Sequence, residues 1–199
     1  MKEILIATTN AGKLREMMVF FRPLRNRINF KNLSDFPSTK TPVENGKNYA
    51  ENALIKAKFF SEKFSIPAIG EDAGILVSAL PEYFGVHTRR SIQAEDDMDW
   101  LTKFLDLMIG CEDKTAKFFS AMAFFDPTDK TSFITEGTVE GTICDFPQAP
   151  IEKGIPLSAV FKPNGSTLVF SAMKTAEKNR ISHRGRAADA MRVFLEKQQ

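Results

Sequence analysis

Residues 2–13 have the sequence KEILIATTNAGK, in which an apolar run gives way to a polar turn. The run is bounded by Thr8, Thr9 and Asn10, which predicts a buried strand over residues 2–7. Asn10 is a favoured helix N-cap residue, so we expect a helix over residues 11–21 that ends before Pro23. A buried strand followed at once by a helix indicates an α/β arrangement.

The rest of the chain alternates between helical and strand patterns. Residues 26–45 are polar and interrupted by prolines, which is typical of a loop. The other expected elements are helices beginning near Asn48 and over 96–108 and 187–195, and strands over 66–69, 118–125 and 132–144. The last two strands flank a turn at 126–129 and form an antiparallel pair, so the predicted fold is α/β with a mixed sheet.

Composition excludes several classes of protein. The 199 residues carry a formal charge of +2 and are 43% hydrophobic, which suits one globular domain over residues 1–199. The balanced charge removes the electrostatic reason to expect nucleic-acid binding. We expect no membrane span and no signal peptide, because the apolar runs are short. Cys111 and Cys144 lack metal-site spacing, and a reducing cytoplasmic setting is the default.

The turn at residues 8–13 is the first candidate site. It lies at a strand end and opens a helix, where free backbone N–H groups and the positive end of the helix dipole favour an anion. Gly12 lets the backbone come close to a ligand, and Lys13 adds a positive charge. The alternative is an ordinary capped turn with a solvated lysine.

The adjacent acids Glu71 and Asp72 form the second candidate. They directly follow an expected strand, where carboxylates can hold Mg²⁺ or activate a water molecule. Glu44 lies in a loop that could reach the same place. A solvated acidic turn is the alternative.

The third candidate covers residues 177–184, where Ser182 can cap the last helix. Lys178, His183 and Arg184 would then gather at the helix N-terminus, where basic groups oppose the dipole unless an anion binds. Neighbouring cations should disfavour protonation of His183. A solvated basic face is the alternative. Arg89 and Arg90 are likewise either a phosphate clamp or surface residues.

Two of these segments supply anion-binding groups, and one supplies carboxylates suited to magnesium. Together they predict a polyphosphate site in which Mg²⁺ and cationic side chains neutralise a triphosphate while a carboxylate prepares water.

The same motifs, taken in order, resemble those of the inosine/xanthosine triphosphate pyrophosphatase family. They are Thr8-Thr9-Asn10-x-x-Lys13-x-x-Glu16, Glu44-Asn45-Gly46, Glu51-Asn52-Ala53, Glu71-Asp72-x-Gly74, Gly85-Val86-x-Thr88-x-Arg90, Asp126-Pro127 and Ser182-His183-Arg184. The resemblance covers nearly the whole chain, and these motifs in one order are far more specific than any one of them.

The resemblance implies an elongated mixed α/β fold with flanking helices and two lobes around a central cleft, in a homodimer. It also implies Mg²⁺-dependent hydrolysis of a nucleoside triphosphate to a nucleoside monophosphate and pyrophosphate. Asp72 matches the acid that activates water, and Glu44 and Asp72 match the metal ligands. The implied substrate-binding residues are Thr8, Thr9, Asn10, Lys13, Lys56, Lys178, His183 and Arg184.

The chain departs from the family at residues 154–161. The family motif Gly-Phe-Gly-Tyr/Trp-Asp-Pro is replaced here by GIPLSAVF, without the aromatic residue that stacks on the purine or the aspartate that helps select the base. Ala73 also stands where a small hydroxyl residue is expected. We therefore expect retained phosphate and metal groups beside a changed base pocket. The alternatives are a nucleotide-binding regulatory relative with little turnover and, against the charge balance, a nucleic-acid-binding module.

Overall fold

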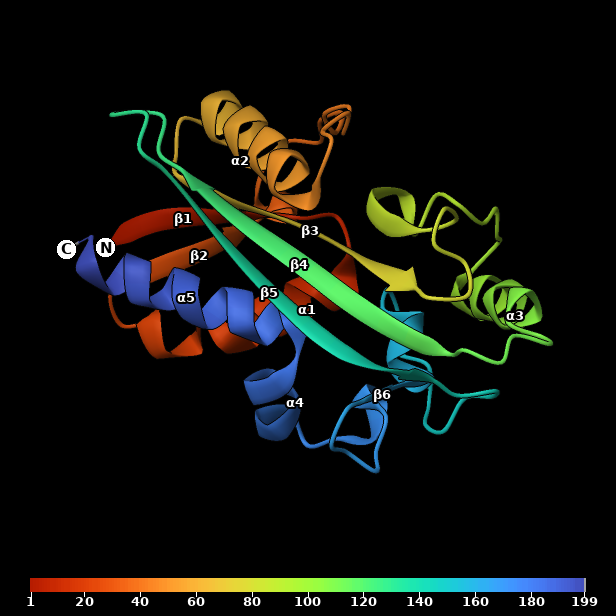
Figure 1. The fold of residues 1–199 in the computed structure, drawn as a ribbon. Coiled ribbons are helices and arrows are strands. Elements are labelled where there is room, and N and C mark those ends of the chain that lie inside the picture. The colour runs from red at the N-terminus through yellow and green to blue at the C-terminus, as the bar shows by residue number, and fades with distance from the viewer. Residues whose placement is uncertain (199) are drawn as a thin grey trace.

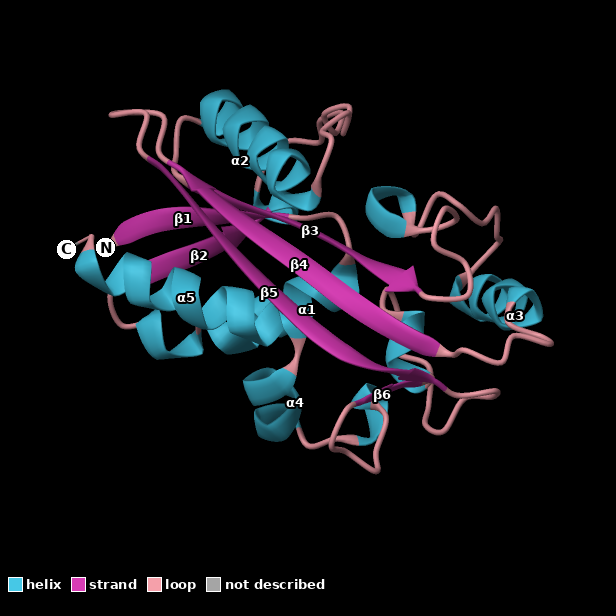
Figure 2. Ribbon diagram, in the orientation of Figure 1, coloured by secondary structure: helices cyan, strands magenta, loops and turns pink. Residues whose placement is uncertain are grey.

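The computed structural model describes residues 1–198, apart from the side chain of His87, and a single mixed sheet forms its centre (Figures 1 and 2). The strands follow the order β2-β1-β3-β4-β5-β6. Strand β1 pairs in parallel with both β2 and β3, whereas the pairs β3–β4, β4–β5 and β5–β6 are antiparallel. Their bounds are β1 (Lys2–Ala7), β2 (Ile28–Asn32), β3 (Ala68–Val77), β4 (Thr115–Phe125), β5 (Ser132–Ile143) and β6 (Phe161–Pro163). The predicted mixed α/β fold is confirmed.

Helices cover both faces of this sheet, as Figure 2 shows. Helix α2 packs on β3 and β4 from one side, and α5 packs on β4 and β5 from the other, beside α1. Helix α3 lies near the same end of the long strands β4 and β5 as β6 (Figure 1). The bounds are α1 (Ala11–Phe20), α2 (Tyr49–Phe64), α3 (Asp97–Leu107), α4 (Thr175–Ile181) and α5 (His183–Lys197). None of the helices between residues 1 and 198 has the length and apolar sequence needed to cross a membrane.

Two glycines allow the helices to approach the sheet closely. A Cβ atom at Gly70 would lie 2.1 Å from the carbonyl oxygen of Ala53 in α2. A Cβ atom at Gly137 would lie 2.1 Å from the carbonyl oxygen of His183 in α5. A side chain at either position would push a helix away from the sheet. Both helices carry candidate site residues, so this close packing helps to position the site.

The structure differs from the sequence-based prediction chiefly in two strands, and it also contains β6 and α4, which were not expected. Residues 28–32 were expected in a loop, but they form β2, which pairs with β1. The segment is short and lies at the sheet edge, so its alternation of buried and partly buried residues is a weak signal by itself. Strand β3 was expected over 66–69, but it continues to Val77 because β4 pairs along its whole length. Glu71 and Asp72 therefore lie within a strand rather than in a turn.

The apolar core on the α5 side of the sheet is divided into two clusters. One surrounds Ile69, Met122 and Phe124 with residues of α1 and α5. The other surrounds Ile75 and Phe118 with residues of α3, β6 and the segment between β5 and α4. In the β3–β4 register, Glu71 and Ala73 lie between these two groups. The two apolar clusters thus meet at a polar seam, and the candidate site lies there.

Candidate active site

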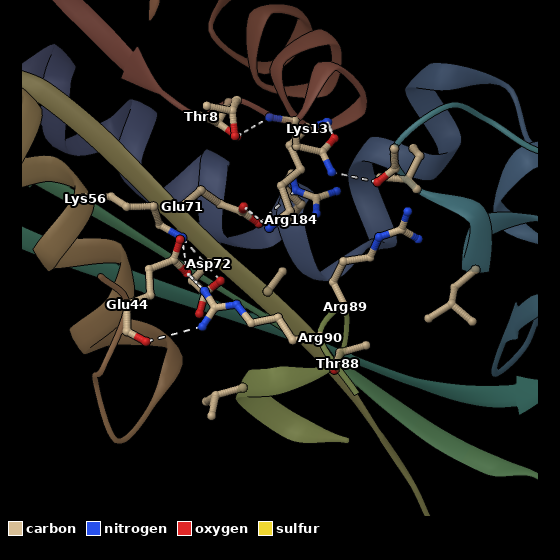
Figure 3. A pocket seen from close by; sticks show the side chains of 18 of the residues that line it. Thr8, Lys13, Glu44, Lys56, Glu71, Asp72, Thr88, Arg89, Arg90 and Arg184 are labelled. Atoms are coloured by element: carbon tan, nitrogen blue, oxygen red, sulfur yellow. Dashed lines mark hydrogen bonds and ion pairs between the residues drawn. The ribbon is translucent and has the colours of Figure 1, made fainter. Parts of the chain in front are cut away.

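A cleft of about 300 Å³ opens where β1 ends. Strand β1 pairs with β3 only as far as Ala7 opposite Gly70, whereas β3 runs on to Val77. The space beyond the end of β1 is bounded by the turn at 8–13, the edge of β3 and the segments around Arg89 and Ile155. Figure 3 shows how these side chains converge from different elements.

Nearly all of the predicted site residues line this one cleft. They are Thr8, Thr9, Asn10, Lys13, Glu44, Lys56, Asp72, His183 and Arg184. The exception is Lys178, which lies outside the lining and pairs with Glu16 at 2.7 Å and with Glu152 at 3.2 Å. Residues from both ends of the chain therefore meet around a common space.

The helix cap at Asn10 connects two walls of the cleft. The side-chain oxygen of Asn10 accepts a hydrogen bond from the Lys13 amide at 3.0 Å, as predicted for an N-cap. Its side-chain nitrogen donates to the carbonyl oxygen of Gly154 at 2.8 Å. Both polar groups of this side chain thus form hydrogen bonds within the protein. They hold the 8–13 turn against the segment at residues 154–161, which departs from the family motif.

Glu71 is the centre of a buried charge network. Its carboxylate pairs with Lys13 Nζ at 2.8 Å and with Arg184 Nε at 3.0 Å, and it accepts a hydrogen bond from Ser120 Oγ at 2.9 Å. Burial by itself would raise the pKa of Glu71, but Lys13 and Arg184 hold that pKa well below its usual range. Successive strand residues point to opposite faces, so Glu71 and Asp72 do not form a common metal site.

Glu16 extends this network on the α1 side. It pairs with Arg184 and, at 2.7 Å, with Lys178. Burial opposes ionisation of Glu16, yet Arg184 and Lys178 keep its pKa lowered. The pKa of Arg184 is raised: burial lowers it, but Glu71 and Glu16 more than compensate. Glu16 was not among the predicted site residues, although it closes the motif that contains Asn10 and Lys13 and follows them at helical spacing.

The acidic wall of the cleft lies on the α2 side of β3. Lys56 Nζ lies 3.1 Å from Glu44 Oε2 and 3.3 Å from Asp72 Oδ1, so one ammonium group joins both carboxylates. Asn52, one turn before Lys56 in α2, donates to Asp72 Oδ2 at 3.1 Å. Arg90 pairs with Glu44 at 3.1 Å. Asn52 was not among the predicted site residues, although it lies in the motif Glu51-Asn52-Ala53.

The donor chemistry of Glu44 and Asp72 suits Mg²⁺. Both are hard oxygen donors that converge on one cationic position, now taken by the Lys56 ammonium. Magnesium is commonly bound through one or two carboxylates together with substrate phosphates. Among the side chains that the structure describes, no group of three or more His, Cys, Asp or Glu residues is arranged to hold a metal. The two carboxylates therefore fit a metal whose coordination the substrate would complete.

His183 is held neutral at the floor of the cleft. Its ring stacks on Phe118 with centroids 4.6 Å apart and planes 8° apart. Burial, followed by the charge of Arg184, lowers the pKa of His183 to about 3, in the direction predicted from its cationic neighbours. Its Nδ1 atom is buried without a hydrogen-bond partner. His183 can thus contribute hydrogen bonds to a ligand, but it does not contribute a charge near pH 7.

The Glu71 network predicts a large stability difference between two ion-pair variants. Glu71→Ala leaves Lys13 and Arg184 without their buried partner, and we expect it to lower the free energy of unfolding by about 3–5 kcal/mol. Glu3→Ala is the control, because Glu3 forms an exposed pair with Lys31 at 3.2 Å. Loss of this pair should lower the free energy of unfolding by less than about 1 kcal/mol. Urea denaturation followed by circular dichroism measures both. Equal losses would contradict the buried network.

His183 also predicts how stability depends on pH. Its pKa is about 3 in the folded protein and about 6.5 ordinarily, so the unfolded chain takes up this proton first as the pH falls. The free energy of unfolding should therefore decrease as the pH falls below 6.5, by on the order of 1 kcal/mol per pH unit. The lowered pKa values of Glu71 and Glu16 add a further loss below about pH 4.5. Urea midpoints at pH 5, 6 and 7 test this, and His183→Asn should flatten the dependence between pH 5 and 6.5.

Comparison with known proteins identifies the family. The sequence profile of the Ham1 family matches residues 4–194. A dITP/XTP pyrophosphatase of Geobacillus kaustophilus is 36% identical over 190 residues, covering 94% of this chain and 91% of that protein. The corresponding protein of Bacillus anthracis is 34% identical over 191 residues, covering 94% of this chain and 93% of that protein.

Solved structures have the same fold. A HAM1 protein from Coxiella burnetii superposes with a TM-score of 0.83 at 28% identity, covering 99% of this chain and 100% of that chain. A nucleoside-triphosphatase (dITP/XTP pyrophosphatase) from Mycobacterium abscessus gives a TM-score of 0.70 at 28% identity, covering 95% and 97%. Because the sequence profile and the relatives span nearly the whole chain, this protein belongs to the Ham1 family.

Proposed function

We propose that this protein hydrolyses nucleoside triphosphates to a nucleoside monophosphate and pyrophosphate, with Mg²⁺ as cofactor. The substrates we propose are non-standard purine nucleotides such as ITP, dITP and XTP, with a base preference altered by residues 154–159. One observation carries the proposal: a single cleft joins the carboxylates Glu44 and Asp72 to the cations Lys13, Lys56 and Arg184. The chain is a hydrolase of nucleotide metabolism, the class of its Ham1-family relatives.

The cations of the cleft suit a triphosphate. Lys13 lies at the N-terminus of α1, where the helix dipole adds to its charge. Backbone and hydroxyl groups of Thr8 and Thr9 lie beside it, and Asn10 holds the turn in place. Arg184 approaches from α5, together with the neutral donor and acceptor groups of His183. We place Lys178 in a supporting position, because it pairs with Glu16, which in turn pairs with Arg184.

Asp72 is the proposed general base. Asn52 holds one carboxylate oxygen, and the other faces Lys56 in the cleft. Asp72 accepts a proton from water as the water oxygen bonds to the α-phosphorus; the bond from that phosphorus to the α–β bridging oxygen breaks, and pyrophosphate leaves with that oxygen. Glu44 and Asp72 would hold Mg²⁺, which when bound neutralises phosphate charge. Lys13 and Lys56 stabilise charge that accumulates on the phosphates.

Product analysis with Asp72→Asn tests this function. The wild type should release pyrophosphate from ITP, dITP or XTP in the presence of Mg²⁺, and chelation of the metal should stop turnover. Asp72→Asn should lower kcat at least about 100-fold, because it removes the base, and should still be stabilised thermally by nucleotide. Asp106→Asn, at an exposed position of α3, is the control and should keep the wild-type rate.

Other outcomes would contradict specific parts of the proposal. Release of orthophosphate would contradict cleavage between the α- and β-phosphates. Full activity of Asp72→Asn would remove its role as base. Thermal stabilisation by nucleotides without any product would favour the alternative, a regulatory relative with little turnover, for which the changed 154–159 segment is the supporting observation.

We also propose a homodimer in the cytoplasm, as the family resemblance implies. Sedimentation equilibrium should give about twice the chain mass of 22.3 kDa. A single species at the chain mass would contradict the dimer and leave the proposed chemistry untouched.

A further inference from the structure

The cleft has one region that the phosphate and metal groups do not use. Glu44, Lys56 and Asp72 occupy one side, and Figure 3 shows Arg90 turned toward them. Arg89 extends in another direction, away from Glu44 and Lys56. On Arg89's side, the cleft is bounded by Trp100 and by residues 154–158, which include Ile155, Pro156 and Leu157. A nucleotide whose phosphates lie among the cations would place its base in this less polar region.

Few flat groups in this region are free to stack on a base. Residues 154–158 contain no aromatic side chain. The ring of Phe118 is stacked with His183. The ring of Trp100 packs on Phe104 with centroids 5.5 Å apart, and the Arg89 guanidinium lies over the Trp100 ring at 5.4 Å. Trp100 is only 2% exposed, whereas the side chain of Arg89 is 54% exposed. The accessible flat surface therefore belongs to Arg89.

Arg89 is also held in place before any ligand binds. Its Nη2 lies 2.9 Å from Asp97 Oδ1, and the other oxygen of Asp97 accepts a hydrogen bond from the Gly154 amide at 2.6 Å. The Trp100 indole N–H donates to the Arg89 carbonyl oxygen at 3.3 Å. These contacts fix the guanidinium between α3 and the changed segment. A group that is already ordered loses less entropy when a ligand packs on it.

We propose that the Arg89 guanidinium is the stacking platform for the nucleobase and thereby a determinant of substrate specificity. Guanidinium planes stack on bases, and the adjoining Trp100 ring would extend the stack on the far side. The larger ring system of a purine overlaps such a platform better than a pyrimidine does, so purine nucleoside triphosphates are the ligand class. This inference rests on the proposed function for the orientation of the nucleotide in the cleft.

Steady-state kinetics of two Arg89 variants test the proposal. Arg89→Ala removes the plane and the charge, and Arg89→Lys keeps the charge alone. With a purine nucleoside triphosphate, both should raise KM roughly 10- to 100-fold, the range provided by stacking on one side chain, and leave kcat within about twofold. The rise in KM of these two variants should be smaller with pyrimidine nucleoside triphosphates. Arg25→Ala, at an exposed position outside the cleft lining, is the control and should leave KM unchanged.

Inorganic tripolyphosphate separates stacking from phosphate binding. As an inhibitor it has no base, so its inhibition constant should be unchanged in Arg89→Ala. A loss of inhibitor affinity equal to the rise in KM would make Arg89 a phosphate ligand and overturn the proposal. An unchanged KM in both Arg89 variants would overturn it as well, and so would rescue of KM by Arg89→Lys. Circular dichroism establishes that each variant is folded.

The single tryptophan gives a readout that does not need turnover. Binding of inosine monophosphate in the presence of a chelator should change the emission of Trp100 in the wild type, with a dissociation constant that rises in Arg89→Ala. If no nucleotide is hydrolysed but this change is seen, the base site stands and the proposed reaction fails. If turnover is normal and Trp100 emission does not respond, the stacking proposal fails alone.

Discussion

The pairing of one buried carboxylate, Glu71, with Lys13 and Arg184 is the interaction on which the site depends. It connects β3 to the first turn of α1 and the first turn of α5, which are far apart in the sequence. Three charges in such a place are costly to desolvate, and replacing buried ion pairs with apolar groups is often neutral for stability. We therefore interpret the network as a means of holding two cations at the cleft rather than as a source of net stability.

The position of this network follows from the division of the core. On the α5 side of the sheet, apolar residues form one cluster near Ile69 and another near Ile75. Glu71 lies between them in β3, opposite the part of β4 that contains Ser120. The cleft lies at the same seam as these charged residues, because β1 ends there and leaves space beside β3.

The cleft without ligand is balanced by its own ion pairs. Lys56 pairs with both Glu44 and Asp72, Arg90 also pairs with Glu44, and Glu71 pairs with Lys13. A triphosphate brings negative charge to the lysines, and a divalent cation brings positive charge to the two carboxylates, so a metal–nucleotide complex satisfies both sets of groups at once. Either component alone would leave some of them without partners. This balance accounts for why acids and bases alternate around the cleft although the net charge of the chain is only +2.

Local sequence determined the elements whose signals lie within a few residues. The Asn10 cap, the apolar run before it and the Ser182 cap of α5 were predicted and are confirmed, because capping and periodicity depend on near neighbours. The site residues predicted from ordered motifs line one cleft, Lys178 excepted. Only the tertiary structure decided that residues 28–32 form a strand, that Glu71 and Asp72 face opposite sides of β3, and that Arg89 covers Trp100. Those features arise from pairing and packing between distant segments, whose partners and orientation a local pattern does not specify.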